Sequence, residues 1–272
     1  MLLKTKLLLI LILASLDLFS QDLYNHENSV QFGIYLYNSN QYDLAVREFE
    51  RSVFLKPGDQ ASYLYLFKIY RRLNAFDKAI DCYSRFSGNL RLEEMNWEFG
   101  SEYLKLLVQK NKFQDAENFA NNNLSLKDAD NYKLSTILLL KDWKRAEIFR
   151  RGINSNISKL LSDITGEGVA FKRKSPALAA LFSAIIPGSG KAYCGRWKDG
   201  IIAFIMTSST ALISVRGFNK NSGSIYPWIM GSFAVAYYSG NIYGSSQSAI
   251  KYNKMQEDEL VDKTRAYILT DN

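Results

Sequence analysis

The sequence predicts an all-α protein in which an array of helical repeats is followed by a membrane-associated helical hairpin with a short re-entrant helix. Three observations support this fold class. A four-residue pattern, aromatic-x-x-Ala, recurs in the first part of the chain. Three apolar runs of helical length follow Lys174. Between Asn221 and Ile250 there is no charged side chain.

The first residues of the chain, 1–20, are predicted to be a signal peptide. Lys4 and Lys6 precede the apolar run Leu7–Leu16, which suits a signal core and is too short to span a membrane comfortably. Cleavage is expected after Ser20, and an uncleaved anchor is the alternative. In both cases this segment stands outside the folded domains.

The recurring pattern indicates four pairs of helices within residues 21–165. Its copies are YDLA at Tyr42–Ala45, FDKA at Phe76–Ala79, FQDA at Phe113–Ala116 and WKRA at Trp143–Ala146. From Ala45 to Ala79 the step is 34 residues, which equals the tetratricopeptide period. Two helices that cross closely need a small residue at the crossing, with aromatic side chains around it. A single pair cannot bury its own apolar face, whereas stacked pairs share a continuous core.

This segment therefore resembles a tetratricopeptide-repeat protein, most specifically in its first two units. The small residues expected at the close crossings are Gly33, Ala45, Ala79, Ala116 and Ala146. The alternative is a generic array of helical hairpins in which the spacing of the pattern is accidental.

The resemblance also implies a binding surface for a peptide or protein segment. Tetratricopeptide arrays bind such partners on a concave face, built mostly from the first helix of each pair. The residues expected on that face are Tyr35, Asn38, Lys68, Arg71 and Arg72. For any one of these side chains, a solvated position at a helix end is the alternative interpretation.

Residues 166–253 are predicted to form a membrane-associated helical domain, with helices near 176–187, 199–216 and 225–250. The first is too short to cross a bilayer, because about 12 residues rise only about 18 Å against a hydrocarbon core of about 30 Å. It is therefore expected to be re-entrant or interfacial. The charged residues 254–272 are expected to form a separate surface helix as a tail. A buried hairpin in a soluble domain is the alternative, since Thr207–Ser209 interrupt the second run with hydroxyl groups.

Small residues recur every fourth position along the third apolar run. They are Ser232, Ala236, Gly240, Gly244 and Ser248. Small residues allow helix backbones to approach closely in lipid, where packing replaces the hydrophobic effect as the driving force. This stripe is predicted to pack against the neighbouring helix of the hairpin.

The stretch IIPGSGKAYCGRWKDG, at Ile185–Gly200, contains a Gly-Ser-Gly-Lys sequence that invites comparison with a phosphate-binding loop. That loop requires glycine where this chain has Ile185 and a hydroxyl where it has Ala192. Both flanks are predicted to be helical, and no strand precedes them. The stretch is therefore interpreted as a turn between membrane-embedded helices.

Residues Ser175–Asn253 resemble a family of uncharacterised bacterial membrane proteins with a Pro-Gly-x-Gly-x-x-Tyr-x-Gly-Arg turn between apolar helices. The matching turn positions are Pro187, Gly188, Gly190, Tyr193, Gly195, Arg196 and Gly200, and downstream matches include Asn241, Tyr243, Lys251, Tyr252 and Asn253. Lys191 departs from the family, which often has glutamine there. The resemblance implies an architecture and a membrane location, without an activity.

Motifs for chemistry are lacking, so a non-enzymatic protein is expected. The only histidine is His26, and Cys82 and Cys194 are too far apart in sequence to indicate a metal site. No catalytic, cofactor-binding or metal-binding residue is predicted. The net charge of the chain is +7, and its densest basic run is Lys172–Lys174, directly before an apolar segment. We therefore expect contact with membrane lipid and none with nucleic acid.

Together these features predict a membrane-tethered interaction or scaffold protein whose repeats bind a protein or peptide partner outside the cytoplasm. The signal peptide favours the bacterial inner membrane, with the repeat domain facing the periplasm. Positive charge gathers on the repeat side of the hairpin, which by itself favours a cytoplasmic repeat domain, but long domains translocate largely regardless of charge. The alternative function is an accessory factor of envelope or membrane-protein assembly that acts through the hairpin, by contacting a membrane protein or a second copy of the chain.

Overall fold

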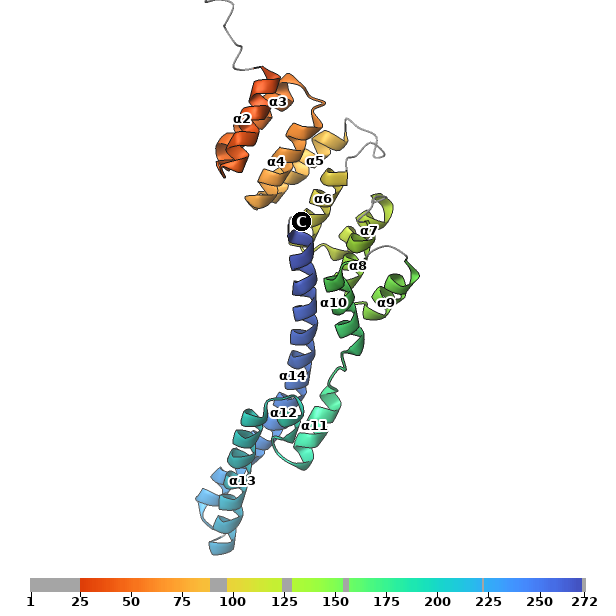
Figure 1. Ribbon diagram of the computed structural model, residues 1–272. Coiled ribbons are helices and arrows are strands. Elements are labelled where there is room, and N and C mark those ends of the chain that lie inside the picture. The colour runs from red at the N-terminus through yellow and green to blue at the C-terminus, as the bar shows by residue number, and fades with distance from the viewer. Residues whose placement is uncertain (1–24, 89–96, 124–128, 154–156, 222, 271–272) are drawn as a thin grey trace, which may run out of the picture. The chain divides into compact units, whose positions relative to one another are not determined.

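The computed structural model describes residues 25–88, 97–123, 129–153, 157–221 and 223–270, and it is all-helical over these ranges (Figure 1). The predicted all-α class is confirmed. The expected signal peptide lies outside the described residues. The chain divides into two compact units, residues 1–127 and 128–272, and each is described by itself.

Within its described residues, the first unit contains three consecutive pairs of helices. They are α2 (His26–Asn38) with α3 (Tyr42–Leu55), α4 (Gln60–Arg72) with α5 (Phe76–Ser87), and α6 (Trp97–Gln109) with α7 (Phe113–Asn123). The two helices of each pair pack against each other, and α4 also contacts α3 and α6. Neighbouring pairs therefore share one core.

The same turn joins the helices within each pair. Asn40, Asn74 and Asn111 adopt left-handed backbone conformations, with φ of 57°, 56° and 56°. Asparagine tolerates this conformation better than most residues. In the first turn, the N–H of Gln41 donates to the carbonyl of Leu36 at 2.9 Å, which closes a Schellman motif. The second helix then begins at the aromatic residue of each aromatic-x-x-Ala copy.

Aromatic side chains fill the core between successive pairs. Phe49 stacks on Tyr65 with ring centroids 4.8 Å apart, and Phe86 stacks on Phe99 at 4.4 Å. Gly33 lies against Phe49, so closely that an added Cβ would stand 3.0 Å from the ring. Burying such rings stabilises the unit, since truncation of a buried phenylalanine to alanine costs about 3–5 kcal/mol.

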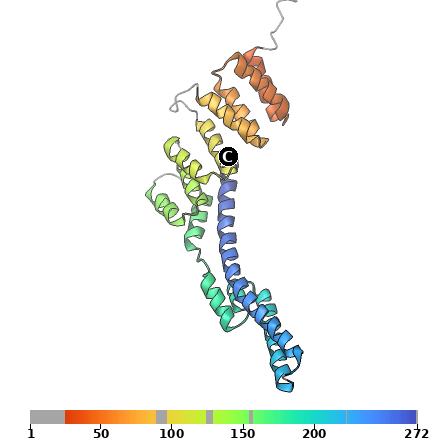
Figure 2. The ribbon, with the colours of Figure 1, turned by 180° about the vertical axis from the view of Figure 1, so that it is seen from behind.

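The second unit is organised around one long helix. It comprises α8 (Ala129–Leu139), α9 (Trp143–Gly152), α10 (Lys159–Ala170), α11 (Pro176–Ile185), α12 (Ser189–Tyr193), α13 (Trp197–Lys220) and α14 (Ile225–Leu269). Helix α14 contacts α11, α12 and α13, and it also contacts α8 and α10 (Figure 2). The turn between α8 and α9 repeats that of the first unit, with Lys141 at φ 61°.

Two expected boundaries differ from the structure. Helix α14 continues for 45 residues, so residues 254–272 do not begin a separate surface helix. Its later part is buried at Leu260, Val261, Thr264 and Ile268, at steps that keep one face toward the unit. The division after residue 127 also differs from the expected domain boundary at 165, which falls inside α10. The fourth helical pair groups with the second unit because α14 offers α8 a packing surface.

Candidate functional site

The turn from α11 to α13 is built on close backbone approaches. Gly188 has φ of 89°, and a Cβ there would stand 1.9 Å from the carbonyl oxygen of Gly200. A Cβ on Gly190 would stand 1.8 Å from the carbonyl oxygen of Ala179. Gly195 faces open space, but its φ of 83° favours glycine. The glycines of the motif therefore have structural roles.

Hydroxyl groups connect this turn to α14. The N–H of Gly190 donates to Oγ of Ser183 at 2.9 Å, and the Ser183 and Ser245 hydroxyls lie 2.7 Å apart in a hydrogen bond. Arg196 donates to Oγ of Ser248 at 3.1 Å and to Asp199 at 2.7 Å. The turn motif is thus held to the middle of α14 by Ser183, Ser245 and Ser248 together with Arg196 of the motif itself.

A second junction fixes the segment before α11. The N–H of Lys174 donates to Oδ1 of Asn253 at 2.8 Å, and Nδ2 of Asn253 donates to the Lys174 carbonyl at 2.9 Å. The Lys174 ammonium lies 4.7 Å from the ring centroid of Tyr193 and 5.7 Å from that of Tyr252. Arg173 pairs with Glu257 at 2.7 Å. Two residues of the basic run therefore bind α14 and its neighbours.

The hairpin of α13 and α14 has polar side chains inside and apolar side chains outside. Its buried polar residues are Thr207, Thr210, Ser214, Asn241, Ser245 and Ser248. Its exposed large apolar residues include Ile201, Ile202, Phe204, Ile205, Leu212, Val215, Ile225, Trp228, Ile229, Phe233 and Val235. This is the reverse of a water-soluble hairpin, which buries its apolar stripe.

Among the described helices, α13 alone is long and apolar enough to cross a membrane. Its 24 residues correspond to about 36 Å at the usual helical rise. The first part of α14, for which a second span is expected, does not reach the same hydropathy. Helices α13 and α14 pack against each other, and Ser214 donates to the Pro227 carbonyl at 2.8 Å near the loop that connects them.

The expected packing stripe of α14 is wrong over most of its length. Ser232, Ala236 and Gly240 are exposed, and no atom lies within 4 Å of a Cβ built on Gly240. The reason is the helical period, because a step of four residues advances about 400° and drifts about 40° each time. Ser248, at the C-terminal end of the stripe, is buried. The aliphatic part of Lys191 packs against Gly244, and the lysine Cε lies 3.7 Å from a Cβ built on that glycine.

The face of α14 that does pack on α13 includes different residues. Pro227 lies against Gly217, where an added Cβ would stand 2.7 Å from the proline Cγ. Gly231 lies against Ser214, with 2.9 Å between the Gly231 Cβ position and the serine Oγ. Farther along α14, Asn241 and Ser245 are buried, and Ser245 bonds to Ser183 of α11. An asparagine within an apolar run was the available sequence signal, since polar groups in such segments usually point inward.

In the repeat segment, the small residues lie at the helix contacts. Ala45, Ala79, Ala116 and Ala146 have no exposed surface. Each donates its N–H to the carbonyl of the residue just before the second helix of its pair. These alanines therefore occupy equivalent positions in the four pairs, three in the first unit and one in the second.

The residues expected on the partner face divide into exposed and buried ones. Tyr35 is 62% exposed, and Asn38 and Arg72 are exposed as well. Arg71 is a correction: it is only 5% exposed, and its Nε donates to Oε2 of Glu102 at 2.7 Å. Its position on α4 turns it toward α6, so it stabilises the contact between neighbouring pairs.

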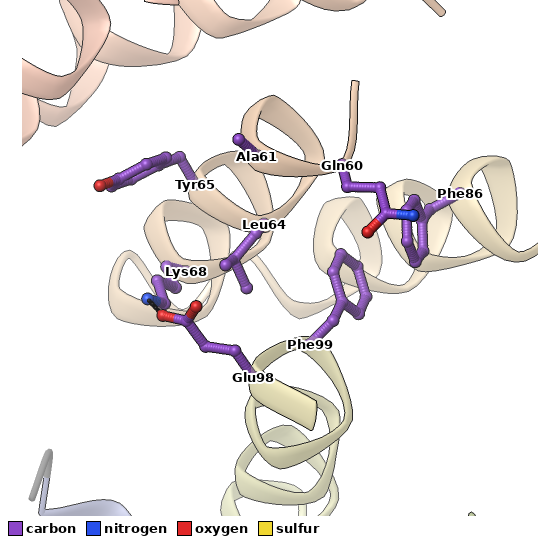
Figure 3. A pocket seen from close by; sticks show the side chains of 8 residues that line it. All are labelled: Gln60, Ala61, Leu64, Tyr65, Lys68, Phe86, Glu98 and Phe99. Atoms are coloured by element: carbon purple, nitrogen blue, oxygen red, sulfur yellow. Dashed lines mark hydrogen bonds and ion pairs between the residues drawn. The ribbon is translucent and has the colours of Figure 1, made fainter. Parts of the chain in front are cut away.

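Lys68 borders a pocket of about 310 Å³ between the first parts of α4 and α6 (Figure 3). Its ammonium pairs with Glu98, and its aliphatic chain lies beside Leu64 and Tyr65 on the same helix. Phe86 and Phe99 close the other side. A pocket with an ion pair at one edge and aromatic walls suits a side chain of a bound protein segment.

The cysteines carry no sign of reactivity. Both are free and buried, and burial raises the pKa of the Cys82 thiol to about 12. Among the described residues there is no cluster of three or more histidine, cysteine, aspartate or glutamate side chains that could hold a metal ion.

Comparisons with known protein families, with curated proteins and with solved structures each find no match for this chain.

Proposed function

We propose that this protein is a non-enzymatic, membrane-tethered scaffold. Its tetratricopeptide-like helical pairs bind a protein or peptide segment, and its region from α11 to residue 253 of α14 is embedded in the bacterial inner membrane, with the repeats on the periplasmic side. The observation that carries the proposal is the reversed polarity of the α13–α14 hairpin.

The reversal argues against an aqueous surface for the hairpin. Trp228 and Val235 are more than half exposed, as are Ile202 and Ile205 on α13. Monomeric soluble proteins rarely expose contiguous apolar patches of this kind. In lipid the same side chains meet hydrocarbon, while the buried hydroxyl groups of Ser214 and Ser245 bond to neighbouring helices. Helix α11 adds to the apolar surface with Leu181 and Ile185.

A charged substitution on the outer face of the hairpin tests whether that face lies in lipid or in water. In a bilayer, Val235→Glu should cost about 2–3 kcal/mol and reduce the membrane-bound fraction of the protein. Met255→Glu, at an exposed position of the same helix beyond the apolar region, is the matched control and should have no effect. The measurement is extraction of membranes with alkaline carbonate. Release of the intact wild-type chain into the soluble fraction would contradict the membrane tether.

The proposal of a binding scaffold rests on the repeated pairs and on the exposed face of their first helices. Tyr35 on α2 and the pocket beside Lys68 on α4 supply aromatic and charged contacts of the kind that anchor peptides. Photo-crosslinking of the full chain in native membranes should capture a protein from a probe at Tyr35. A probe at Phe54, which is exposed on the second helix of the same pair, should not capture that protein. Equal capture at both positions would contradict a binding face on the first helices.

A second candidate, an accessory factor of envelope or membrane-protein assembly, is favoured by one observation. The exposed small residues Ser232, Ala236 and Gly240 leave room on α14 for a helix of a membrane protein or of a second copy. Cysteine crosslinking from position 232 in native membranes tests this, since a specific crosslinked species should form there and not from the outward-facing position 235.

A further inference from the structure

A second pocket, of about 430 Å³, is an open groove along α13 and α14, lined in part by exposed residues. Lys191 and Arg196 line one end, Thr207 and Asn241 line its interior, and Ala236 and Gly240 leave the space that larger side chains would fill. The exposed part of the small-residue stripe therefore borders a cavity in the chain itself.

Two polar side chains in this pocket have no partner among the described residues. Asn241 is 4% exposed, and neither its Oδ1 nor its Nδ2 makes a hydrogen bond. Thr207 is 6% exposed, and its Oγ1 is also unpartnered. Thr210, one turn along, instead donates to the carbonyl of Met206 at 2.7 Å. A buried amide without hydrogen bonds is costly, and such groups nearly always have a partner.

The charged end of the pocket carries Lys191, Arg196 and Asp199, and its remaining positive charge, that of Lys191, favours an anion. Arg196 has one carboxylate partner, Asp199, while no ion pair or hydrogen bond engages the Lys191 ammonium within the described part of the chain. The Lys191 chain lies against Gly244, which precedes Ser245 and lies about one helical turn from Asn241. Gly244 and Asn241 are separated by about 4.5 Å of helical rise along α14.

We propose that this pocket binds an anionic phospholipid whose headgroup carries hydroxyl groups. The lipid phosphate lies at Lys191 and Arg196. The Asn241 amide donates to an ester carbonyl and accepts from a headgroup hydroxyl, and Thr207 donates to the second ester. The acyl chains follow the apolar side chains Ile202, Met206 and Tyr237 out of the pocket. The inference rests on the membrane location in the proposed function and adds a specific lipid to it.

The spacing of groups fits this ligand better than it fits a free anion. A phosphate ion would occupy only the Lys191 end and would leave the Asn241 amide and the Thr207 hydroxyl unsatisfied. A phospholipid carries a phosphate, two ester carbonyls and apolar chains, and the pocket offers cations at one end with polar and apolar side chains interleaved along the rest of its wall.

The test uses the full-length protein in neutral detergent. Its thermal unfolding is followed by tryptophan fluorescence during titration with phosphatidylglycerol, phosphatidylcholine or inorganic phosphate. A ligand that binds only the folded state raises the midpoint in a concentration-dependent way. Phosphatidylglycerol should stabilise the wild type at concentrations at which the other two do not.

Two sets of variants, each with a matched control, locate the site. Asn241→Leu and Thr207→Val should each weaken the apparent affinity for phosphatidylglycerol about tenfold, the equivalent of one or two hydrogen bonds. Thr210→Val, which alters a buried and already bonded threonine, should bind as the wild type does. Lys191→Gln should remove the preference over phosphatidylcholine, whereas Lys198→Gln, which lies outside the pocket lining, should keep it.

Three results would overturn the proposal. If the lipid response is equal in the wild type and in Asn241→Leu, the amide does not bind lipid. If inorganic phosphate stabilises as well as phosphatidylglycerol does, the site binds the anion alone. If Asn241→Leu releases a co-purifying protein while the lipid response stays unchanged, the pocket belongs to a partner helix. Should Asn241→Leu fail to fold, Thr207→Val and Lys191→Gln answer the same question. The membrane tether is tested by carbonate extraction, and that test does not depend on the outcome of the lipid titration.

Discussion

The hydroxyl oxygens of Ser183 and Ser245 lie 2.7 Å apart in a hydrogen bond that joins α11 to α14. Ser183 also accepts from the N–H of Gly190 in the turn that follows. Both serines are completely buried. One small polar cluster thus holds three segments together, and the glycine turn is its most constrained part.

Two alanine substitutions in the turn should show how much stability is lost through a steric clash and how much through backbone strain. Gly190→Ala places a Cβ against the backbone carbonyl of Ala179, which no side-chain rotation can relieve. We expect a loss of at least about 3 kcal/mol. Gly195→Ala meets open space and pays only for its left-handed conformation, about 1 kcal/mol. Thermal unfolding in detergent, followed by circular dichroism, measures both, and equal losses would contradict the packing described for the turn.

The two glycines on opposite faces of α14 should respond differently to a large side chain. Gly240→Leu is expected to leave the midpoint of unfolding in lipid-free detergent within a few degrees of the wild type, because nothing lies near its Cβ position. Gly231→Leu should destabilise the hairpin by about 1–3 kcal/mol, because its Cβ meets Ser214. The opposite order would mean that the predicted four-residue stripe, including Gly240, packs after all.

The buried cluster of Glu102, Arg71 and Lys105 should matter more than the exposed pair beside it. Glu102 accepts from Arg71 at 2.7 Å and from Lys105 at 2.9 Å. Glu102→Gln removes the charge that two buried cations share and should cost about 3–5 kcal/mol. Glu98→Gln, one turn earlier on α6 and half-exposed beside Lys68, should cost less than about 1 kcal/mol. Urea unfolding of the full chain in detergent compares the two variants, and similar midpoints would argue against the buried placement of Arg71.

Cys82 should be unreactive in the folded protein. Burial raises the pKa of its thiol to about 12 from an ordinary value of 9.0, so the thiol stays protonated at pH 8. Its reaction with a thiol-specific disulfide reagent should follow unfolding, with fast labelling only in denaturant. Because the unfolded thiol ionises at lower pH than the folded one, its contribution to stability falls as the pH rises above about 9. Rapid labelling of Cys82 under native conditions would contradict its burial.

Much of the secondary structure could be predicted from the sequence because its causes are local. The aromatic residue of each aromatic-x-x-Ala copy begins a helix, and the asparagines two positions earlier tolerate the left-handed turn. Pro187 and Gly188 end α11 as expected. These features depend on neighbours a few residues away, so a pattern of residue types is enough to predict them.

Less of the candidate site could be predicted from the sequence, because the face that a helix buries depends on the helix that packs against it. The four-residue stripe of α14 is regular in sequence, yet the helical period turns most of it away from α13. Arg71 and Arg72 are adjacent, but one lies buried beside Glu102 and the other is exposed. Asn241 was recognised only as part of a motif, and its unpartnered amide became visible once α13 lay against it.

The sequence by itself determined the all-helical class, the positions of the inter-helix turns and the glycines that the α11–α13 turn requires. Each follows from backbone preferences and short-range hydrogen bonds. Only the tertiary structure decided that α14 runs unbroken to Leu269, that the hairpin keeps its hydroxyl groups inside, and that a pocket remains between α13 and α14. These properties come from the rotation and register of helices against one another, which long-range packing sets and local sequence does not.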